Sequence, residues 1–352
     1  MVSFPDPRAH HPFHMHEMIR RQPVFLSETL DRVGRVGAGS FLPPSRRLVV
    51  TGCGTSFHAA MYGARLLHAV LAPRVCVEAT HAYGLAHDSV APPPGSTVLG
   101  VSHSGATPTT NRALSRARKA GHRTLALCGL ANTDMEAVAD ATLVIGSVHD
   151  RSWANTMSYT SQLAAFASLA ARAGRRGAGF LPDLRALPRL AQTALRCETP
   201  IRALARRVAR APHVTFLASG SDETTAQEAA LKIRETCSLP AVGYHAEQFL
   251  HGPFLSIARR EPVVALRSRD DRARFETILH ALSRSGADVT TVGESPRAEI
   301  RLPRIHPALR PIVSVIPMQF LAYYAALARK TNPDLMRTDV PRYRAGVEAL
   351  FR

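Results

Sequence analysis

Lysine is almost absent from this sequence, and acidic residues are few. Lysine occurs only as Lys119, Lys232 and Lys330, whereas Lys and Arg together number 44 against 27 Asp and Glu. The formal net charge of +17 therefore comes from arginines spread along the whole chain. There is no basic run of five or more residues and no basic strand rich in aromatics, so we expect no nucleic-acid partner. The charge is better suited to attracting small anionic substrates.

Cysteines are few, odd in number and widely spaced. The five are Cys53, Cys76, Cys128, Cys197 and Cys237. This spacing indicates neither a disulfide framework nor a zinc site, and we expect no metal ion. Buried reduced thiols are the ordinary state of such residues. Cys53 lies in a glycine-rich turn, where we expect a small packing residue rather than a nucleophile.

Long apolar runs are also missing. No apolar stretch reaches the length that spans a bilayer, and the first residues lack the apolar core of a signal peptide. We therefore expect no membrane partner and a cytoplasmic location. Hydrophobic residues nevertheless make up 45% of the 352-residue chain. That content is typical of a folded protein, and the length suffices for two domains.

The sequence contains one order of segments twice. Residues 47–72 read as an apolar strand, a Gly/Ser/Thr turn and a helix, and residues 213–233 read in the same order. Residues 97–129 read as a strand, a polar loop, an amphipathic helix and a second strand, and residues 262–293 match them. This alternation predicts βαβ units, which build parallel sheets.

The spacing between these segments is the same in both halves. Gly54 and Ser102 are 48 positions apart, and so are Gly220 and Ser268. Short apolar strands suit a sheet that is covered on both faces. We therefore predict an α/β protein of two tandem domains, each a parallel sheet flanked by helices.

Composition suggests the limits of these domains. Gly, Arg and Pro cluster at 172–185, which we interpret as the linker, and an arginine-rich helical segment follows at 187–210. The predicted organisation is an N-terminal helical arm at 1–40, a first domain at 41–185, a second domain at 186–330, and a C-terminal loop and tail at 331–352.

Two loops of the first half are rich in glycine and hydroxyl side chains. Gly52–Ser56 and Ser102–Thr107 each follow a strand and lead into a helix. Ligands of open parallel sheets bind at that edge, and the free N–H groups of a helix start favour an anion. The hydroxyl residues are alternatively simple helix N-caps. Because two loops share the pattern, we predict a phosphate site.

The second half lacks this pattern. Its matching loop at 267–271 has Arg267, Arg269, Asp270 and Asp271 in place of the hydroxyl groups. We therefore expect one phosphate site per chain, in the first half.

Three charged residues of the second half share one helical face. Glu228, Lys232 and Glu235 follow the i, i+4 and i+7 spacing. Such charges usually form an exposed ion-pair ladder. Opposite a phosphate loop, a carboxylate beside a lysine is instead a candidate general base. We take Glu235 as that candidate.

One histidine lies in a predicted turn. His251 precedes Gly-Pro, and loops carry function more often than cores do. Glu247 and His251 have the i, i+4 spacing of metal ligands, but no third ligand accompanies them, so we expect no metal site. For His245 the sequence favours neither a functional nor a structural role. A solvated N-terminal arm is expected to contain His10, His11, His14 and His16.

Two motifs resemble those of the sugar isomerase (SIS) domain family. They are Gly-Thr-Ser at 54–56 and Ser-x-Ser-Gly-x-Thr at 102–107. The likeness is closest to the isomerase half of the glucosamine-6-phosphate synthases (glutamine–fructose-6-phosphate aminotransferases). Further matching stretches lie at 16–19, 22–23, 154–156, 160–163, 229–235, 251–253 and 317–323. The resemblance implies a flavodoxin-like, three-layer αβα fold for each domain.

The resemblance also implies roles for individual residues. The family's phosphate loop corresponds to Ser102, His103, Ser104 and Thr107. The residues that contact the sugar correspond to Thr55, Ser56, Asn155 and Thr156. The family's proton-transferring glutamate, its supporting lysine and its ring-opening histidine, which reaches in from the partner subunit, correspond to Glu235, Lys232 and His251.

The sequence departs from the synthases at two points. It starts with Met1-Val2-Ser3 and leads directly into the isomerase arm, so we expect no glutaminase domain. The family's Schiff-base lysine falls on Pro341 in one register and on Gly346 in another, and arginine cannot form an imine. Unless Lys232 or Lys330 replaces it, the expected chemistry is enolisation, which needs no imine and no cofactor.

The main hypothesis is therefore a homodimeric enzyme that isomerises or deaminates a hexose 6-phosphate or its amino form, or aminates it with free ammonia. One alternative is a non-catalytic sugar-phosphate sensor. Transcriptional sensors of this family carry a helix-turn-helix ahead of one SIS unit, and the first 40 residues are too short for that fold. Another alternative is a synthase subunit that receives ammonia from a separate glutaminase.

Overall fold

The computed structural model of the chain describes residues 6, 8–36, 41, 46–87, 91–269 and 272–350. The chain divides into two compact units, each built around one sheet. The first-sheet unit comprises Gln22–His149 and Met157–Arg189. The second-sheet unit comprises Met1–Arg21, Asp150–Thr156 and Leu190–Arg352. A short internal segment, 150–156, therefore belongs to a different unit from the chain on either side of it.

Short parallel strands form the first sheet. They are β1 (Arg47–Thr51), β2 (Cys76–Ala79), β3 (Thr97–Ser102), β4 (Arg123–Cys128) and β5 (Ala141–Val144), in the order β2-β1-β3-β4-β5. Every neighbouring pair is parallel. This is the flavodoxin-like order, whose switch point lies between β1 and β3. Thr51 lies opposite Gly100, so the loops that leave β1 and β3 emerge side by side at the carboxyl edge.

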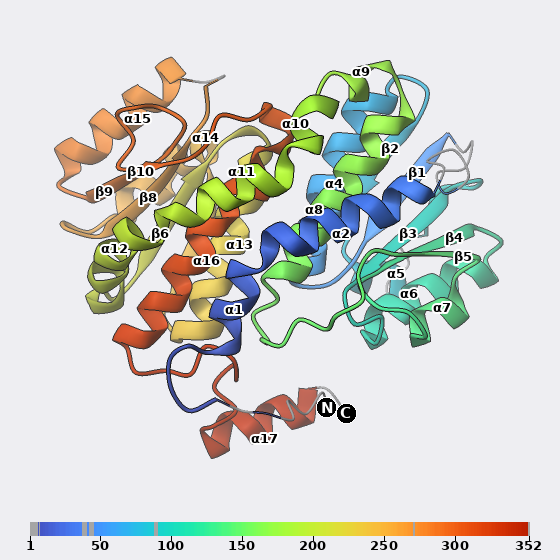
Figure 1. The fold of residues 1–352 in the computed structure, drawn as a ribbon, viewed down its shortest axis with the longest axis horizontal. Coiled ribbons are helices and arrows are strands. Elements are labelled where there is room, and N and C mark those ends of the chain that lie inside the picture. The colour runs from blue at the N-terminus through green and yellow to red at the C-terminus, as the bar shows by residue number, and fades with distance from the viewer. Residues whose placement is uncertain are drawn as a thin grey trace. The chain divides into compact units, whose positions relative to one another are not determined.

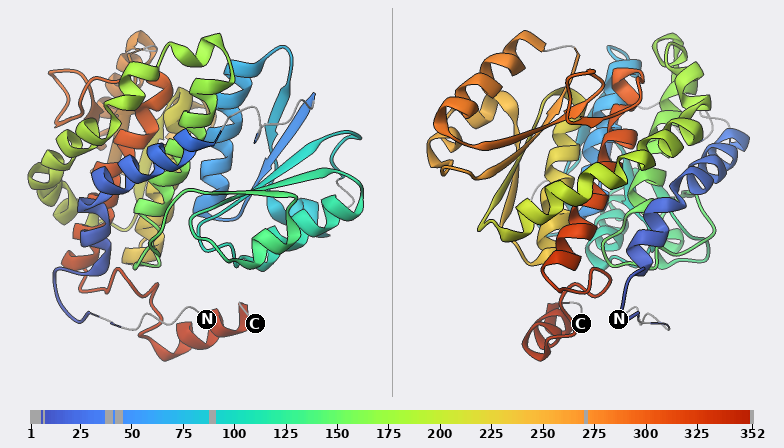
Figure 2. Two further views of the ribbon diagram at one scale, coloured as in Figure 1. Left: turned by 45° about the vertical axis from the view of Figure 1, so that its right-hand side comes forward. Right: turned by 60° about the vertical axis from the view of Figure 1, so that its left-hand side comes forward.

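Helices cover both faces of the first sheet (Figures 1 and 2). One face carries α2 (Gln22–Arg35), α4 (Thr55–Leu71) and α8 (Met157–Ala173). The other carries α5 (Ala82–His87), α6 (Pro108–Lys119) and α7 (Asp134–Val138). Successive strand residues point to opposite faces, and Val49, Val98 and Ala126 pack with α5, α6 and α7. Apolar cover on both faces explains why the strands read as continuous apolar runs.

The second sheet repeats this order. Its strands are β6 (Val214–Ala218), β7 (Ala241–His245), β8 (Pro262–Arg267), β9 (Asp288–Gly293) and β10 (Ile300–Arg301), in the order β10-β9-β8-β6-β7. All neighbouring pairs are parallel. The predicted fold of two flavodoxin-like αβα domains is confirmed.

Helices also cover the second sheet on both sides (Figure 1). Phe249, Phe275 and Ile278 of α14 (Ala246–Leu250) and α15 (Arg272–Ser285) pack on one face. The other face carries α12 (Glu198–Arg210), α13 (Glu223–Cys237) and α16 (Arg310–Ala328). Short helical turns connect these elements: η1 (Leu195–Cys197), η2 (Gly220–Asp222), η3 (Pro253–Ser256) and η4 (Pro307–Leu309).

The predicted linker region is helical. Residues 172–185 include α9 (Arg175–Ala178) and α10 (Leu181–Arg185), and α11 (Leu187–Ala194) follows. The arginine-rich segment at 187–210 is helical as expected, being formed by α11, η1 and α12.

The stretch that contains α16 is more apolar than the sequence analysis allowed. Pro307–Ala328 is long and apolar enough to cross a membrane by length and composition. The expectation that no stretch reaches this length is therefore wrong. In the structure 83% of the 18-residue apolar window is buried inside the protein, and α16 packs against both α12 and α13. A core helix passes the same test of length and composition.

The N-terminal arm is less solvated than expected. It forms α1 (His14–Arg20) and α2, which belong to different units. His10 is exposed, but the His14 side chain is buried and His16 Nε2 lies 2.8 Å from a carboxylate oxygen of Glu198. Even the exposed His11 contacts a neighbour, with Nδ1 2.6 Å from the Tyr323 hydroxyl. The solvated-arm interpretation is therefore wrong for His14 and His16.

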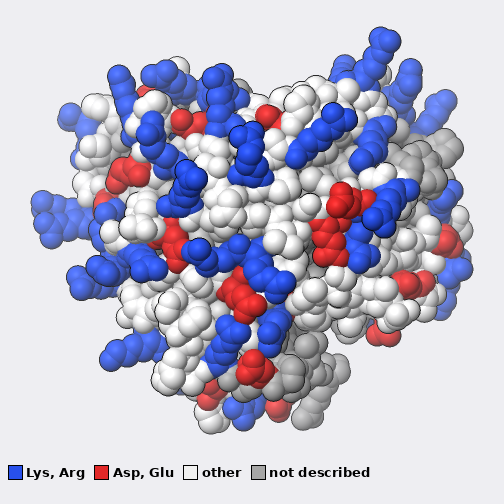
Figure 3. Space-filling model, viewed as in Figure 1, with Lys and Arg blue, Asp and Glu red and all other residues white. Residues whose placement is uncertain are grey.

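The C-terminal segment differs from the expected loop and tail. It contains α17 (Pro341–Leu350), a helix with no buried residue. Charged side chains are scattered over the face of the molecule in Figure 3, with acidic groups among the basic ones.

Close packing of α4 on α8 generates the first prediction. A Cβ atom at Gly63 of α4 would lie 2.5 Å from the ring of Phe166. We expect Gly63→Ala to lower the free energy of unfolding by about 1–3 kcal/mol, the usual effect of overpacking. Gly346→Ala in α17 is the matched control, because a Cβ there meets nothing within 4 Å. Urea unfolding followed by circular dichroism compares them, and equal losses in both variants would contradict this packing.

Candidate active site

The turn after β1 brings a glycine and two hydroxyl residues to the start of α4. Gly54 is the N-cap, at φ +52°, and provides no side-chain cap. Thr55 is buried, and the Ser56 hydroxyl accepts a hydrogen bond of 3.0 Å from the Gln162 amide of α8. A Cβ at Gly52 would lie 2.9 Å from the Ser56 carbonyl oxygen. The turn is thus tight because only glycine fits between β1 and α4.

The loop after β3 is folded by its own hydroxyl groups. Ser102 Oγ accepts the Gly105 amide at 3.1 Å and lies 3.2 Å from Thr107 Oγ1. Ser104 Oγ accepts the Ala106 amide at 3.3 Å. Gly105 has φ +64°, a conformation that favours glycine. The loop therefore curls so that hydroxyl and amide groups gather where α6 begins.

Contacts from neighbouring helices hold this loop. The Gly105 carbonyl accepts hydrogen bonds from the Asn111 side-chain amide at 3.0 Å and from the Met135 backbone amide at 3.1 Å. Thr107 is the N-cap of α6 but makes no side-chain cap bond. The N-cap explanation considered for the hydroxyl residues is therefore not supported at either helix start.

We call these two turns, Gly52–Ser56 with Ser102–Thr107, the cradle, which is the predicted phosphate site. Both follow adjacent strands at the switch point of the sheet, where open α/β sheets bind ligands. Each leads into a helix of at least three turns, whose free N–H groups and dipole favour an anion. The structure thus brings together Thr55, Ser56, Ser102, Ser104 and Thr107 within one unit.

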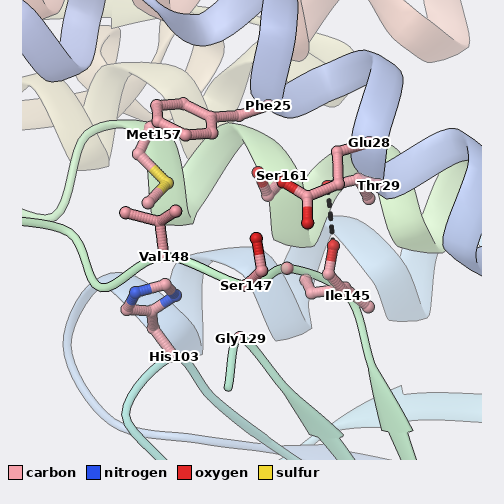
Figure 4. Close-up of a pocket in the computed structure, with 11 residues that line it drawn as sticks. Phe25, Glu28, Thr29, His103, Gly129, Ile145, Ser147, Val148, Met157 and Ser161 are labelled. Carbon is pink, nitrogen blue, oxygen red and sulfur yellow. Dashed lines mark hydrogen bonds between the residues drawn. The ribbon is translucent and has the colours of Figure 1, made fainter. Parts of the chain in front are cut away.

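His103 is placed differently from the other predicted loop residues. Its side chain is buried, and a Cβ at Gly129 would lie 2.0 Å from its Nδ1. Figure 4 shows the ring among the side chains that line a small pocket, Val148 and Met157 among them. The pocket volume of about 10 Å³ suffices for roughly one water molecule. Burial, with a contribution from His149 at a ring distance of 5.4 Å, lowers the pKa of His103 to about 3. The imidazole is therefore neutral and packs inside the unit.

The second-sheet unit holds the predicted base in a buried ion-pair cluster. Lys232 Nζ lies 3.2 Å from Glu228 Oε1 and 2.5 Å from Glu235 Oε2, and it donates a 2.5 Å hydrogen bond to the Ala154 carbonyl. Glu228 and Lys232 are fully buried, whereas the Glu235 side chain is 15% exposed. The interpretation of these charges as an exposed ladder is wrong.

The charge state of Lys232 follows from these contacts. Burial alone lowers the pKa of the ammonium, but the carboxylates of Glu228 and Glu235 outweigh it and the net pKa is raised. A protonated amine is no nucleophile, so Lys232 is not suited to imine formation. Lys330, the other amine considered for that role, is exposed beyond the end of α16.

Segment 150–156 contains two of the four predicted sugar-contacting residues, Asn155 and Thr156, and contacts this cluster through Ala154. The backbone of Asn155 has the left-handed conformation, at φ +51°, and its side-chain amide donates a 3.0 Å hydrogen bond to the Trp153 carbonyl. The Thr156 carbonyl accepts a 3.0 Å hydrogen bond from Gln319 of α16. The Ala154 carbonyl was not predicted as a partner of Lys232, because the role of a backbone oxygen leaves no signal in the sequence.

His251 and His245 have different settings. His251 lies in the turn after α14 with a 70% exposed side chain, 3.8 Å from Glu247, whose carboxylate is bound by Arg274. His245 is the N-cap of α14, since its Nδ1 accepts the Glu247 amide at 3.2 Å. This contact gives His245 a structural role. Among the residues that the structure describes, no three potential metal ligands cluster.

Two segments of the chain, 41–172 and 208–329, match the SIS domain. The chain belongs to the SIS domain family. It is also 31% identical over 351 residues to a glutamine–fructose-6-phosphate aminotransferase [isomerizing] of Acidithiobacillus ferridurans, covering 92% of this chain and 57% of that protein. The chain is 30% identical over 311 residues to the same enzyme of Legionella pneumophila strain Paris, and the alignment covers 85% of this chain and 51% of that protein. This SIS chain thus spans about half the length of these curated relatives.

Solved structures support the fold. The C-terminal domain of glucosamine-fructose-6-phosphate aminotransferase from Francisella tularensis superposes with a TM-score of 0.85 at 21% identity, over 93% of this chain and 99% of that one. Tagatose-6-phosphate ketose/aldose isomerase from Escherichia coli superposes with a TM-score of 0.80 at 21% identity, over 95% of this chain and 98% of that one. Glucosamine-6-phosphate deaminase from Thermotoga maritima superposes with a TM-score of 0.79 at 18% identity, over 92% of this chain and 97% of that one.

In the second SIS segment, the edge that corresponds to the cradle holds internal ion pairs. Asp222, at the η2 turn, is buried and paired with Arg310, and Ser314 donates a 2.5 Å hydrogen bond to it. Arg310 also donates to the Arg267 carbonyl at 2.7 Å. Of the charged loop noted in the sequence, Asp270 and Asp271 lie outside the described residues. One phosphate site per chain stays a prediction that agrees with these pairs.

Hydroxyl groups of the cradle generate a binding prediction. Ser104→Ala combined with Thr107→Ala should weaken binding of a hexose 6-phosphate at least about tenfold, because charge-assisted hydrogen bonds contribute about 1.5–3 kcal/mol each. Ser115→Ala, farther along α6, is the control and should bind normally. Isothermal titration calorimetry measures the affinities, and an unchanged affinity in the double variant would reject the cradle.

The buried cluster generates a stability prediction. Lys232→Met should lower the free energy of unfolding by about 3–5 kcal/mol, because Glu228 would remain buried without its cation. Since the pKa of Lys232 is raised on folding, the stabilisation is fully present below its ordinary value of 10.5 and is lost as the pH rises through the folded-state value. Denaturant unfolding at neutral pH measures the loss, and a variant as stable as the wild type would refute it.

Proposed function

We propose that this SIS protein is an enzyme that moves a proton between C1 and C2 of an open-chain hexose 6-phosphate or its 2-amino form. The observation that carries the proposal is the setting of Glu235. Its carboxylate is held by a buried, protonated Lys232 beside segment 150–156, yet remains 15% exposed. A fixed, ionised and accessible carboxylate is what a general base requires.

Recognition of the phosphate is the role we give to the cradle. Ser102, Ser104 and Thr107 offer hydroxyl groups, and the starts of α4 and α6 offer backbone N–H groups. Short hydroxyl side chains bind phosphate oxygens without crowding them. Thr55, Ser56, Asn155 and Thr156 are proposed to contact the sugar, as the resemblance to the synthases implies.

Proton transfer is the role we give to Glu235. Starting from the ketose, its carboxylate removes a proton from C1, the electron pair forms the C1–C2 double bond, and the carbonyl electron pair of C2 moves to O2 to give an enediolate. Transfer of the hydroxyl proton from O1 to O2 and return of the first proton from the carboxyl group to C2 give the aldose, so no atom is gained or lost. Lys232 remains protonated and keeps the carboxylate ionised. Because Lys232 is held as an ammonium and neither Pro341 nor Gly346 can form an imine, we propose enolisation without a Schiff base.

Ring opening is proposed for His251. Its side chain is exposed, which suits a group that acts on the substrate of a second copy, as the resemblance implies. We accordingly propose a homodimer in the cytoplasm. Substrates of the amino-sugar type are favoured because the curated relatives are aminotransferases and one solved relative is a glucosamine-6-phosphate deaminase.

A second candidate function is that of a synthase subunit fed with ammonia by a separate glutaminase. It is favoured by the similarity of the chain to the glutamine–fructose-6-phosphate aminotransferases. A proton NMR time course distinguishes the candidates. Glucosamine-6-phosphate reports deamination or isomerisation, and fructose-6-phosphate with ammonium reports amination. No change with any of them would favour a sensor.

The assigned base generates a direct prediction. Glu235→Gln should abolish turnover in that NMR assay, because an amide cannot accept the proton, while sugar-phosphate affinity stays close to that of the wild type. Glu223→Gln, at the start of the same helix, is the matched control and should remain active. Undiminished turnover in Glu235→Gln would remove Glu235 from the mechanism.

A further inference from the structure

Asp334 caps a helix from the opposite end of the chain. It lies after α16 and its side chain is buried. Asp334 Oδ2 accepts the His14 amide and Oδ1 accepts the Met15 amide, each at 2.8 Å. These are the first amides of α1, whose own N-cap residue, Phe13, makes no side-chain cap bond. Figure 1 shows α1 beside α16, where the C-terminal segment leaves it.

The same residue holds segment 150–156. The Asp334 carbonyl accepts the Trp153 amide at 3.4 Å, and the Ser152 side chain acts on the carboxylate by favouring its ionised form, which lowers the pKa against the opposing effect of burial. Ser152 Oγ in turn accepts the Ala154 amide at 3.3 Å. Asp334 itself is fixed by Asn332, whose side-chain oxygen accepts the Asp334 amide at 2.9 Å. Both oxygens and the backbone of Asp334 are therefore engaged.

This contact chain leads to the proposed base. Ala154, which follows directly, gives its carbonyl oxygen to Lys232 Nζ, and Lys232 binds Glu235. All of these residues belong to the second-sheet unit. We propose that Asp334 is a positioning residue, which fixes segment 150–156 so that the Ala154 carbonyl keeps Lys232 against the carboxylate of Glu235. The inference rests on the proposed function and adds to it a residue that touches no substrate.

The geometry makes this role sensitive to a single atom. A buried carboxylate is tolerated when its oxygens accept hydrogen bonds. An asparagine at this position would place its NH₂ group against the backbone N–H of His14 or Met15. One of the two hydrogen bonds would then be replaced by a repulsive contact between two donors. Segment 150–156 would then shift, and Lys232 would lose the carbonyl that fixes its third N–H.

The test compares Asp334→Asn with Asp339→Asn. Asp339 lies in the same C-terminal segment but is exposed, which makes it the matched control. With the sugar phosphate found in the NMR assay, kcat of Asp334→Asn should fall on the order of 100-fold, the effect of a displacement of about 1 Å at a catalytic group. Affinity for the same sugar phosphate should be unchanged.

The pH–rate profile separates positioning from a general structural defect. With Lys232 no longer held beside Glu235, the acid limb of kcat/KM should move to higher pH, because the nearby cation favours the ionised base. A fall in kcat without this movement, or a fall in affinity as large as that in kcat, would overturn the positioning role. The Asp339→Asn variant should show neither change.

Trp153 provides a readout that does not depend on activity. It is the sole tryptophan of the chain, so its fluorescence reports on segment 150–156. Acrylamide quenching should increase in Asp334→Asn and remain at the wild-type value in Asp339→Asn. Equal quenching in all three proteins would overturn the inference even if the wild type turned over no sugar phosphate, a result that would refute only the proposed function.

A milder variant covers the case in which Asp334→Asn does not fold. Ser152→Ala removes only the hydroxyl that accepts the Ala154 amide. It should lower kcat and increase Trp153 quenching in the same direction and to a smaller extent. Wild-type values for both measurements in Ser152→Ala would overturn the proposed contact chain.

Discussion

The buried ammonium of Lys232 is the group on which the arrangement of the second-sheet unit depends. A cation with no exposed surface is tolerated only when its N–H groups find partners. Its partners come from two parts of the chain, namely Glu228 and Glu235 of α13 and the carbonyl of Ala154. The contacts that stabilise this one charge therefore also fix the position of Glu235, the proposed base, relative to α13 and to the distant segment 150–156.

The first-sheet unit depends on a different constraint, the close approach of β1 and β3. Parallel pairing sets two strand ends side by side, and glycines let both turns fold back tightly. Hydroxyl and amide groups are thereby concentrated at one edge. In the second sheet the same topology carries the Asp222–Arg310 ion pair instead. The same topology thus carries hydroxyl-rich turns in one unit and a closed internal ion pair in the other, according to the residues at the strand ends.

The sequence predicted the features that depend on pattern. Alternation of strands and helices predicted the fold, which is confirmed, whereas the phosphate site that glycine and hydroxyl residues predicted at the cradle stays a prediction. The predictions from sequence failed where a residue's environment depends on tertiary contacts with residues distant in the sequence. The helical spacing of Glu228, Lys232 and Glu235 does not reveal that the first two are fully buried. Likewise, nothing in the sequence near His14 indicates that Asp334, 320 positions away, receives its amide. Backbone acceptors such as the Ala154 carbonyl are invisible in principle.

The exchange of segment 150–156 between the units has a consequence for the modular character of the protein. The chain leaves the first-sheet unit, contributes seven residues to the other unit and returns. A cut at any single peptide bond therefore cannot yield two fragments that each contain one complete unit. Recombination of halves from different homologues would separate the segment from the α13 and C-terminal residues that hold it. Although the architecture repeats, neither unit is one continuous stretch of the chain.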